Sequence, residues 1–551
     1  VRRPGGVLRP ARVPRDARAA RRRHRGARGD EGPGPATPAK PSLIAKEARQ
    51  HGESVHRWRI PRQQRERRDR GRDSGTEEVI AEVPDADAAD IDRAVEAARR
   101  AQRGWRLVDG LERVGMLHRC ADRLEEFADE LAVLLTREGG KTLKENRDEI
   151  DWSVTAFRHL GEVARASRGR VVGATKPGQI NLVLNEPLGV VVHILPFNYP
   201  IVLLAWQVAA ALAAGNAYIV KPSEHTPLAT LRLGEVFSDL PAGVFNVVTA
   251  SGAGAQRLVE HPGTDMIAFT GSVAVGSRIM AAAAPRIKKL LLELGGSDPF
   301  IVLGDAKLDV AARGGVFAAF LNAGQVCTSA ERFYIEDSVY DDFMTRAEEV
   351  IGSLRVGDPF GDVDVGALIS RSAREQVSRV IDEISSLGAN VVRGGQVPPE
   401  LPRGYFYEPT LIEVTDANRQ RFEDEIFGPL ATVTRVRDLE DAIACANGSN
   451  FGLGANIYTS SLEMAMRAAT ELQAGTVWIN DPLKDNDAAP FGGMKFSGLG
   501  RELGIEGISA FTQSKHVHMD FAQAPSPEWW FPYERPAIAE ERASASGATP
   551  A

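Results

Sequence analysis

The chain has 551 residues, of which 43% are apolar and 26% charged, and its formal net charge is −7. This length and composition are typical of a globular protein with two or more domains. The charge is uneven, because residues 1–76 carry a net +14 and the remainder a net −21. An acidic body argues against a nucleic-acid partner. The longest apolar run, 15 residues over 201–215, is too short to span a bilayer, so no membrane partner is expected.

Residues 1–76 are rich in Arg, Pro and Gly and lack sustained apolar periodicity. Such a composition buries too little apolar surface to offset the entropy of ordering the chain. We therefore expect a disordered Arg-rich extension that ends at residue 76, derived from a mis-framed or mis-started upstream region. A basic arm that binds nucleic acid or an anionic surface is the alternative interpretation.

Apolar periodicity predicts a strand at 77–83, followed by a mainly helical region and then by alternating strands and helices. Short β-branched runs predict further strands at 190–195, 218–220, 245–248 and 266–270. Helices are predicted over 85–103, 111–137, 145–166, 201–215, 227–240, 309–322, 338–352 and 371–387. The alternation of strand and helix predicts an α/β fold with doubly wound parallel sheets.

Three features have ordinary structural explanations. Gly139-Gly140-Lys141-Thr142 resembles the end of a phosphate-binding loop, but Leu135 stands where that loop requires glycine, so we expect a helix end. His516 and His518 would share one face of a strand without a third ligand, so no metal site is predicted. The three cysteines have no paired spacing, which argues against disulfides and predicts a reducing, cytoplasmic compartment.

Cys327 and Glu293 are the first candidates for catalysis. A thiolate can attack a carbonyl carbon, and a carboxylate can activate water against the resulting thioester. An isolated cysteine is more often an inert buried thiol. Here, however, Gly324, Thr328 and Ser329 flank the cysteine with small side chains that leave room for a substrate.

Further polar residues follow predicted strands, at the sheet edge where α/β proteins bind ligands. The amide of Asn198, between two prolines, could donate to an oxyanion, although a simple turn is the alternative. Lys221 and Glu224 suit the hydroxyls of a ribose, and the carboxylate would repel a 2′-phosphate, which favours NAD over NADP. Gly271 and Ser272 could present N–H groups to a pyrophosphate, or Ser272 could be an ordinary helix N-cap.

Seven segments together resemble, in the same order, motifs of the aldehyde dehydrogenase superfamily. They are Pro196–Pro200, Lys221–Glu224, Phe269–Gly276, Glu293–Gly296, Gly324–Thr328, Glu425–Pro429 and Pro490–Gly504. The resemblance covers about residues 77–520. It implies an aldehyde-dehydrogenase-like fold with two doubly wound parallel-sheet domains and a small β oligomerisation element.

The resemblance also implies domain boundaries. An NAD-binding domain would comprise 77–167 and 187–294, and a catalytic domain 295–490. Strands within 168–186 and 508–520 would form the oligomerisation element, and 521–551 would be a tail. A homodimer or homotetramer is implied.

The site residues are implied in the same way. Cys327 would be the nucleophile, Asn198 would share the oxyanion hole with the Cys327 backbone N–H, and Glu293 would be the general base for deacylation. Glu502 resembles a carboxylate that buttresses the catalytic glutamate. The residues expected to hold NAD are Leu195, Lys221, Glu224, Phe269, Gly271, Ser272, Gly276, Glu425 and Phe427.

The implied reaction is the oxidation of a small-molecule aldehyde to a carboxylic acid. A coenzyme-A-acylating or semialdehyde-specific relative is the alternative. Gln207 departs from the family pattern, which commonly has Lys after Trp206, so a charged link in a proton relay is missing. The acidic stretch Asp481–Asp487 would line the substrate tunnel and favours a polar or cationic aldehyde, with simple solvent exposure of the stretch as the alternative.

Overall fold

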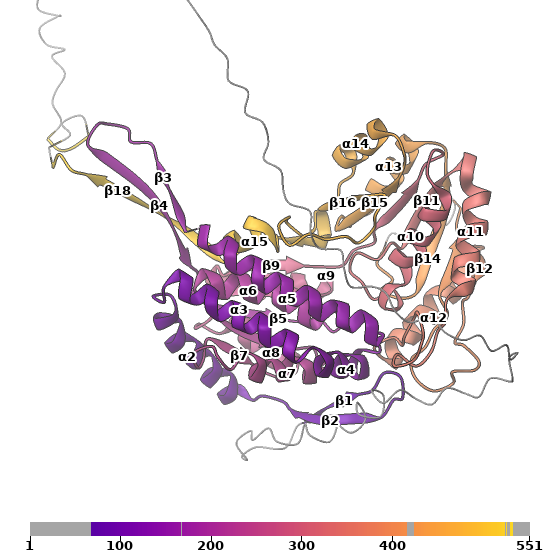
Figure 1. Ribbon diagram of the computed structural model, residues 1–551, viewed down its shortest axis with the longest axis horizontal. Helices are drawn as coiled ribbons and strands as arrows, with labels where there is room; N and C mark the ends of the chain where they lie inside the picture. Colours follow the sequence, from indigo (N-terminus) through magenta and orange to yellow (C-terminus); the bar gives the residue numbers. More distant parts are fainter. Residues whose placement is uncertain (1–67, 167, 416–423, 524, 526–528, 533–551) are drawn as a thin grey trace, which may run out of the picture. The chain divides into compact units, whose positions relative to one another are not determined.

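The computed structural model describes residues 68–166, 168–415, 424–523, 525 and 529–532 (Figure 1). All of them belong to one compact unit, Ala48–Ala551. Within this described part the strands form sheets of seven, six, three and two strands. No helix in the described ranges is long and apolar enough to cross a membrane.

The six-stranded sheet has the order β17-β9-β8-β5-β6-β7, and every neighbouring pair is parallel except β17–β9. Its strands are β5 (Val190–Ile194), β6 (Ala217–Lys221), β7 (Phe245–Val247), β8 (Met266–Thr270), β9 (Lys289–Glu293) and β17 (Gly498–Leu499). β-branched residues alternate between its two faces: Val191 joins one core cluster, whereas Val190 and Val192 join another.

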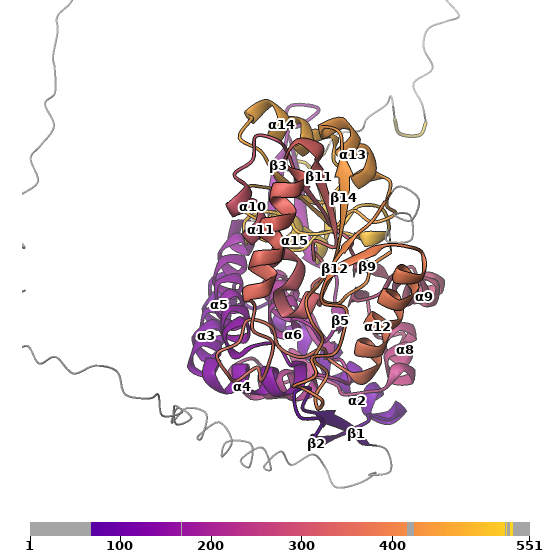
Figure 2. The same cartoon turned by 90° about the vertical axis from the view of Figure 1, so that its right-hand side faces the viewer.

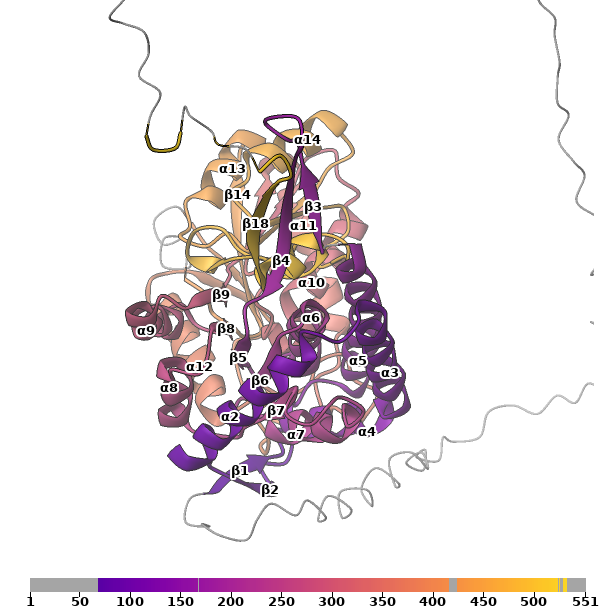
Figure 3. The same cartoon turned by 90° about the vertical axis from the view of Figure 1, so that its left-hand side faces the viewer.

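Helices cover both faces of this sheet, which explains why its strands are apolar throughout (Figure 3). The core on one face is shared with α3 (Gly110–Glu126), α4 (Ala128–Gly139), α5 (Leu143–Ala166), α6 (Pro200–Ala214) and α7 (Pro227–Val236). The other packs against α2 (Ala88–Trp105), α8 (Gly252–Glu260) and α9 (Val273–Ala283). The predicted helix over 111–137 is in fact two helices that meet at Phe127. The break was not predicted, because the apolar period continues across it.

The seven-stranded sheet has the order β12-β13-β14-β11-β10-β15-β16 and is parallel apart from β12. Its strands are β10 (Pro299–Val302), β11 (Arg332–Glu336), β12 (Asn390–Arg393), β13 (Thr410–Glu413), β14 (Leu430–Val436), β15 (Gly454–Tyr458) and β16 (Thr476–Ile479). Its helices are α10 (Leu308–Phe320), α11 (Tyr340–Ser353), α12 (Arg371–Ser386), α13 (Leu439–Asn447) and α14 (Leu462–Glu471). Figure 2 shows α10 and α11 alongside β11 and β14. Two mainly parallel sheets confirm the predicted α/β class.

The small sheet is antiparallel and has the order β18-β4-β3. It consists of β3 (Gly169–Val172), β4 (Gln179–Pro187) and β18 (Thr512–Asp520). The predicted segment 508–520 is therefore only partly a strand, because 508–510 belong to α15 (Gly504–Ala510). Ile508 of this helix is buried in the main core.

Regular structure begins before residue 77, contrary to the expected start. β1 (Arg68–Arg72) pairs antiparallel with β2 (Val79–Pro84) through a turn at 73–78. Within the turn the carboxylate of Asp73 accepts from the N–H groups of Gly75 and Thr76 at 3.1 and 3.0 Å. An Arg-rich composition hid this strand, because backbone pairing with β2 does not require apolar side chains on both faces.

Candidate active site

The Cys327 loop, residues 321–331, connects α10 to β11 and has an unusual backbone. Asn322, Ala323 and Gly324 have φ of +50°, +54° and +73°, the left-handed region that disfavours side chains with a Cβ. A Cβ on Gly324 would lie 2.0 Å from the carbonyl oxygen of Gly428, so only glycine fits there. This tight reversal turns the chain directly from α10 into the turn that carries Cys327.

The Glu293 loop contacts the Cys327 loop directly. Glu293 is the last residue of β9, only 3% exposed, at the carboxyl end of a parallel strand. A Cβ on Gly296 would lie 2.1 Å from the carbonyl oxygen of Cys327, so the two loops touch backbone to backbone. The carboxyl group of Glu293 also lies close enough to the Cys327 thiol for its charge to raise the pKa of that thiol.

Asn198 reaches the same loop from the other side. It lies between β5 and α6, is 7% exposed, and its side-chain Nδ2 donates to the Gln325 carbonyl oxygen at 3.1 Å. Gln325 is two positions before Cys327. An amide nitrogen carries two protons, so one remains for a ligand. The structure thus brings Cys327, Glu293 and Asn198 to one place, and their catalytic roles remain predictions.

Glu293 is a buried carboxyl group without a local partner. Neither of its oxygens has a hydrogen-bond partner among the described residues. Burial raises its pKa well above the usual value, and the charge of Glu502 raises it further. Buried polar atoms are rarely left unpaired, so this carboxyl group is placed for a task other than holding the fold.

Glu502 is the first of a series of hydrogen-bonded side chains, none of which is a cation. The Gln207 amide donates to its carboxyl group, and the Tyr218 hydroxyl donates to the Gln207 oxygen at 3.4 Å. The Tyr218 hydroxyl also contacts His193 Nδ1 at 2.9 Å. Burial lowers the pKa of His193 to about 3, so this imidazole is neutral at physiological pH. Gln207 therefore leaves the buried Glu502 hydrogen-bonded to a neutral amide.

The surroundings also disfavour the thiolate. Burial raises the pKa of Cys327 well above its ordinary value, and the charges of Glu293 and Asp298 raise it further. Because the thiolate is the nucleophilic form, the sulfur needs a neighbouring positive group or base before it can react.

The predicted ribose-binding residues meet at the ends of β5 and β6. The N–H of Leu195 donates to the Lys221 carbonyl oxygen at 2.9 Å, and Lys221 Nζ lies 2.6 Å from Glu224 Oε1. Lys221 is buried, whereas the Glu224 side chain is 43% exposed. A cavity of about 250 Å³ borders Glu224 and His225. An ammonium and a carboxylate side by side at a sheet edge fit the hydroxyl groups of a sugar.

The turn before α9 corrects one expectation. The N–H of Gly271 is not presented to a ligand, because it donates to the carbonyl oxygen of Glu293 at 2.9 Å and extends the pairing of β8 with β9. Ser272 is the N-cap of α9, without a side-chain hydrogen bond to the helix. A Cβ on Gly276 would lie 2.7 Å from Leu294, so this glycine lets α9 pack closely against the Glu293 loop. Phe269 is buried at the end of β8.

Glu425 and Phe427 come to the site from the other sheet. Glu425 Oε1 accepts from the N–H of Gly296 at 3.1 Å, and burial raises the pKa of Glu425 to about 7. The Phe427 ring packs edge-on against Phe197 with 5.8 Å between centroids. The buried carboxylate of Glu331 accepts from the N–H of Phe427 at 2.8 Å and fixes this loop. Sequence reasoning missed Glu331, whose only signal is its position one residue before β11.

The chain matches the sequence model of the Aldehyde dehydrogenase family over residues 61–517. It belongs to the aldehyde dehydrogenase family. Betaine aldehyde dehydrogenase of Bacillus subtilis is 36% identical over 463 residues, 83% of this chain and 94% of that protein. Glutarate-semialdehyde dehydrogenase of Pseudomonas aeruginosa is 39% identical over 446 residues, 80% and 92% of the two chains. The NAD⁺ complex of betaine aldehyde dehydrogenase from Staphylococcus aureus superposes with a TM-score of 0.81 at 32% identity, covering 84% and 94%.

These comparisons confirm the resemblance and the fold of this aldehyde dehydrogenase. The family match begins at residue 61, before the expected boundary at 76. The pairing of β1 with β2 overturns the same boundary on structural grounds. The remainder of the predicted Arg-rich extension, 1–67, lies outside the described residues.

The glycine pair ends a helix as predicted, and the two histidines of β18 share one hydrogen-bond partner. His516 and His518 both contact Asn181 Oδ1, at 3.1 and 2.7 Å, and no metal-binding group of His, Cys, Asp and Glu occurs among the residues that the structure describes. α4 ends at Gly139, and Gly140 is its left-handed C-cap with φ of +77°. The next side chain, that of Lys141, is buried in the protein, which the sequence pattern did not indicate.

Proposed function

We propose that this aldehyde dehydrogenase oxidises an aldehyde to a carboxylic acid with NAD, through a thiohemiacetal and a thioester on Cys327. The observation that carries the proposal is the meeting of three loops. The backbone carbonyl oxygen of Cys327 lies against Gly296. The backbone carbonyl oxygen of Gln325 accepts a hydrogen bond from Asn198 Nδ2 at 3.1 Å. Glu293 lies beside them, buried and without a hydrogen-bond partner among the described residues.

The residues support a stepwise reaction. The Cys327 thiolate bonds to the aldehyde carbon, and the carbonyl π electrons move to the oxygen, to which Asn198 Nδ2 donates. The carbon–hydrogen bond then breaks with loss of a hydride, and the carbonyl re-forms as a thioester. Glu293 takes a proton from water as the water oxygen bonds to the thioester carbon. The carbon–sulfur bond breaks, which releases the carboxylic acid and restores the thiolate.

NAD fits the polar residues at the carboxyl ends of the strands. Lys221 and Glu224 would hold one ribose, and Glu425 would hold the other, with Phe427 beside the ring. When bound, NAD⁺ supplies the hydride acceptor for the reaction at Cys327. The Glu224 carboxylate favours NAD over NADP by repelling a 2′-phosphate. The NAD⁺ complex of the Staphylococcus aureus relative supports this choice.

The decisive experiment identifies the product. The purified chain is supplied with NAD⁺ and a panel of aliphatic, aromatic, amino- and semialdehydes, with and without coenzyme A. We expect NADH formation without coenzyme A and a free carboxylic acid by mass spectrometry. An acyl-coenzyme A product, or NADH formation only when coenzyme A is present, would instead support the acylating alternative.

A polar or cationic aldehyde is the substrate class that the loop 481–487 favours. Asp485 is half-buried, and its charge contributes to the raised pKa of Cys327. Asp481 is exposed, and its charge contributes to the raised pKa of Tyr458 instead. Of Asp481 and Asp485, Asp485 is thus the one among the charges that raise the pKa of the thiol. The relatives include both a betaine aldehyde and a glutarate-semialdehyde dehydrogenase, so the panel must contain both cationic and anionic aldehydes.

A homodimer or homotetramer through the small sheet completes the proposal. Val171, Val172, Ile180 and Leu184 are large apolar residues of β3 and β4 that are exposed in the isolated chain, Val171 by 75%. Apolar side chains on an exposed sheet favour burial against another chain. Sedimentation velocity tests this: a Val171→Lys variant should dissociate at concentrations at which the parent stays associated, and a parent that sediments as a monomer would contradict it.

A further inference from the structure

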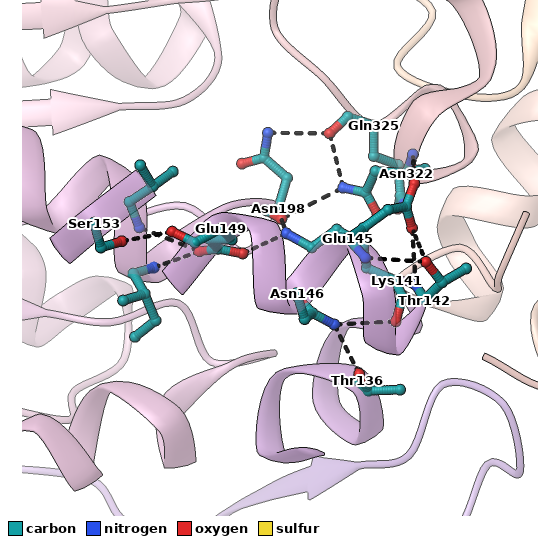
Figure 4. A network of polar contacts seen from close by, with 12 residues as sticks. Thr136, Lys141, Thr142, Glu145, Asn146, Glu149, Ser153, Asn198, Asn322 and Gln325 are labelled. Atoms are coloured by element: carbon teal, nitrogen blue, oxygen red, sulfur yellow. Dashed lines mark hydrogen bonds and ion pairs between the residues drawn. The ribbon is translucent and has the colours of Figure 1, made fainter. Parts of the chain in front are cut away.

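Lys141 is a buried cation beside the candidate active site that the proposed reaction does not use. It follows the end of α4 and is 2% exposed. Its ammonium forms an ion pair with Glu149 and lies 3.5 Å from the centroid of the Tyr199 ring. It also donates to the backbone carbonyl oxygen of Asn198 at 3.1 Å (Figure 4). A buried charge is costly unless its partners are well placed, so this cation restricts the conformation of everything it touches.

Glu149 binds the other end of the same segment. It lies on α5, is 1% exposed, and its Oε1 accepts from the N–H groups of Ile201 and Val202 at 2.7 and 3.2 Å. These are N–H groups of the first turn of α6, which has no side-chain N-cap of its own. Through one ion pair, α5 therefore holds the carbonyl of Asn198 and the start of the helix behind it.

The Cys327 loop is tied to the same point. Asn322 Nδ2 donates to the Asn198 carbonyl oxygen at 3.4 Å and to the Gln325 carbonyl oxygen at 3.2 Å. The N–H of Asn322 donates to Glu145 on α5 at 2.8 Å. Asn322 is the first residue of the left-handed run, whose conformation needs such outside contacts to persist. Figure 4 shows Asn198 and Asn322 converging on Gln325 next to Lys141.

We propose that the Lys141–Glu149 ion pair is a positioning pair that holds the Asn198 amide at a set place relative to the Cys327 sulfur. The inference rests on the proposed function, in which that amide stabilises the oxyanion. Rotation of the peptide plane after Asn198 would move its side chain, and the ammonium on the carbonyl oxygen opposes that rotation. The pair itself touches neither substrate nor NAD and acts through Asn198.

The test compares the rate of enzyme acylation, measured as the first turnover of NADH at saturating aldehyde, in a set of variants. The double variant Lys141→Met, Glu149→Gln removes both charges at nearly constant volume and leaves no unpaired buried charge. We expect its acylation rate to fall by about 10²-fold, close to the loss of one oxyanion donor. NAD affinity and the rate of Cys327 alkylation by iodoacetamide should stay within about threefold of the parent, as expected if only positioning changes.

A merely structural role is excluded by non-additivity. Combining the double variant with Asn198→Ala should slow acylation no further than Asn198→Ala alone, because the pair acts through that amide. As the matched control, Arg232→Met, Glu130→Gln removes an ion pair of 2.7 Å between α7 and α4 and should acylate at the parent rate. If the double variant fails to fold, as judged by circular dichroism, Asn322→Gly takes its place. Glycine accepts the positive φ, and the substitution removes the amide that contacts the Asn198 carbonyl. We expect the acylation rate to fall by about tenfold, and not to fall further in the Asn198→Ala background.

Two results separate this inference from the proposed function. If Asn198→Ala acylates at the parent rate, the oxyanion role of Asn198 is wrong, and the positioning role is overturned with it. If Asn198→Ala is slow while the double variant acylates normally, or while the two losses multiply, the proposed function stands and the positioning role alone is wrong.

Discussion

The side-chain amide of Gln207 donates a hydrogen bond to the carboxyl group of Glu502, although 295 positions separate the two residues. Glu502 in turn raises the pKa of the buried Glu293. A neutral amide cannot offset a negative charge as a cation would, so the two carboxyl groups compete for ionisation. Burial is the main cause of the raised pKa of Glu293, and the charge of a neighbour outside its own loop raises it further.

The first prediction concerns the pH dependence of turnover. The pKa of Glu293 is raised, and a base must be ionised to act, so steady-state turnover should fall as the pH drops through that pKa. Glu502→Gln removes the like charge and lowers the pKa of Glu293, so the acid limb of the profile should move to lower pH. Profiles of kcat for both proteins measure this. A limb that stays in place or moves to higher pH would show that Glu502 does not act on the base.

The second prediction separates acylation from hydrolysis. Glu293→Gln keeps the size of the side chain but cannot accept the proton of water. An initial burst of NADH, equal to the concentration of active sites, should survive while steady turnover falls by about 10²–10⁴-fold. Stopped-flow measurement of NADH gives both phases. Cys327→Ala is the control: it should show no burst while still binding NAD. A Glu293→Gln enzyme without a burst would place this residue in the acylation step instead.

The third prediction concerns the contact between the two catalytic loops. A methyl group at Gly296 would lie 2.1 Å from the Cys327 carbonyl oxygen, so Gly296→Ala must displace one loop. We expect the free energy of unfolding to fall by about 1–3 kcal/mol. The acylation rate should fall by a larger fraction of its parent value than the free energy of unfolding does. Gly104→Ala is the matched control, because nothing lies within 4 Å of its added methyl group. Urea unfolding and single-turnover rates test both, and normal acylation by Gly296→Ala would contradict this geometry.

The fourth prediction addresses substrate charge. Burial and the charge of Asp487 raise the pKa of Asp485 to about 7. The carboxyl group ionises as the pH rises through that value, so the KM for an aldehyde with a fixed positive charge should fall over the same range. Asp485→Asn should raise this KM by about tenfold, equivalent to about 1.4 kcal/mol, and abolish its pH dependence. A neutral aldehyde of similar size is the control. Equal changes for both substrates would remove Asp485 from substrate selection.

Local patterns predicted the element types and most candidate site residues. A period of two or 3.6 is visible in any short window, and glycine turns and helix caps depend on a few neighbouring residues. This is why α6 and β5 were expected within two residues of their observed bounds. β1 was missed because its Arg-rich sequence has no apolar alternation. Its pairing with β2 is made by backbone groups, which the side chains do not indicate.

By itself, the sequence determined that Cys327, Glu293 and Asn198 are candidates for one reaction and that the chain is an α/β protein. Only the tertiary structure decided that the Gly271 N–H pairs with the Glu293 carbonyl and that Lys141 meets Glu149 beside Asn198. The physical reason is that the partner of a buried polar group is set by how distant elements pack. A side chain that reads as the polar end of a helix can therefore become a buried ion pair once α5 and α6 lie against each other.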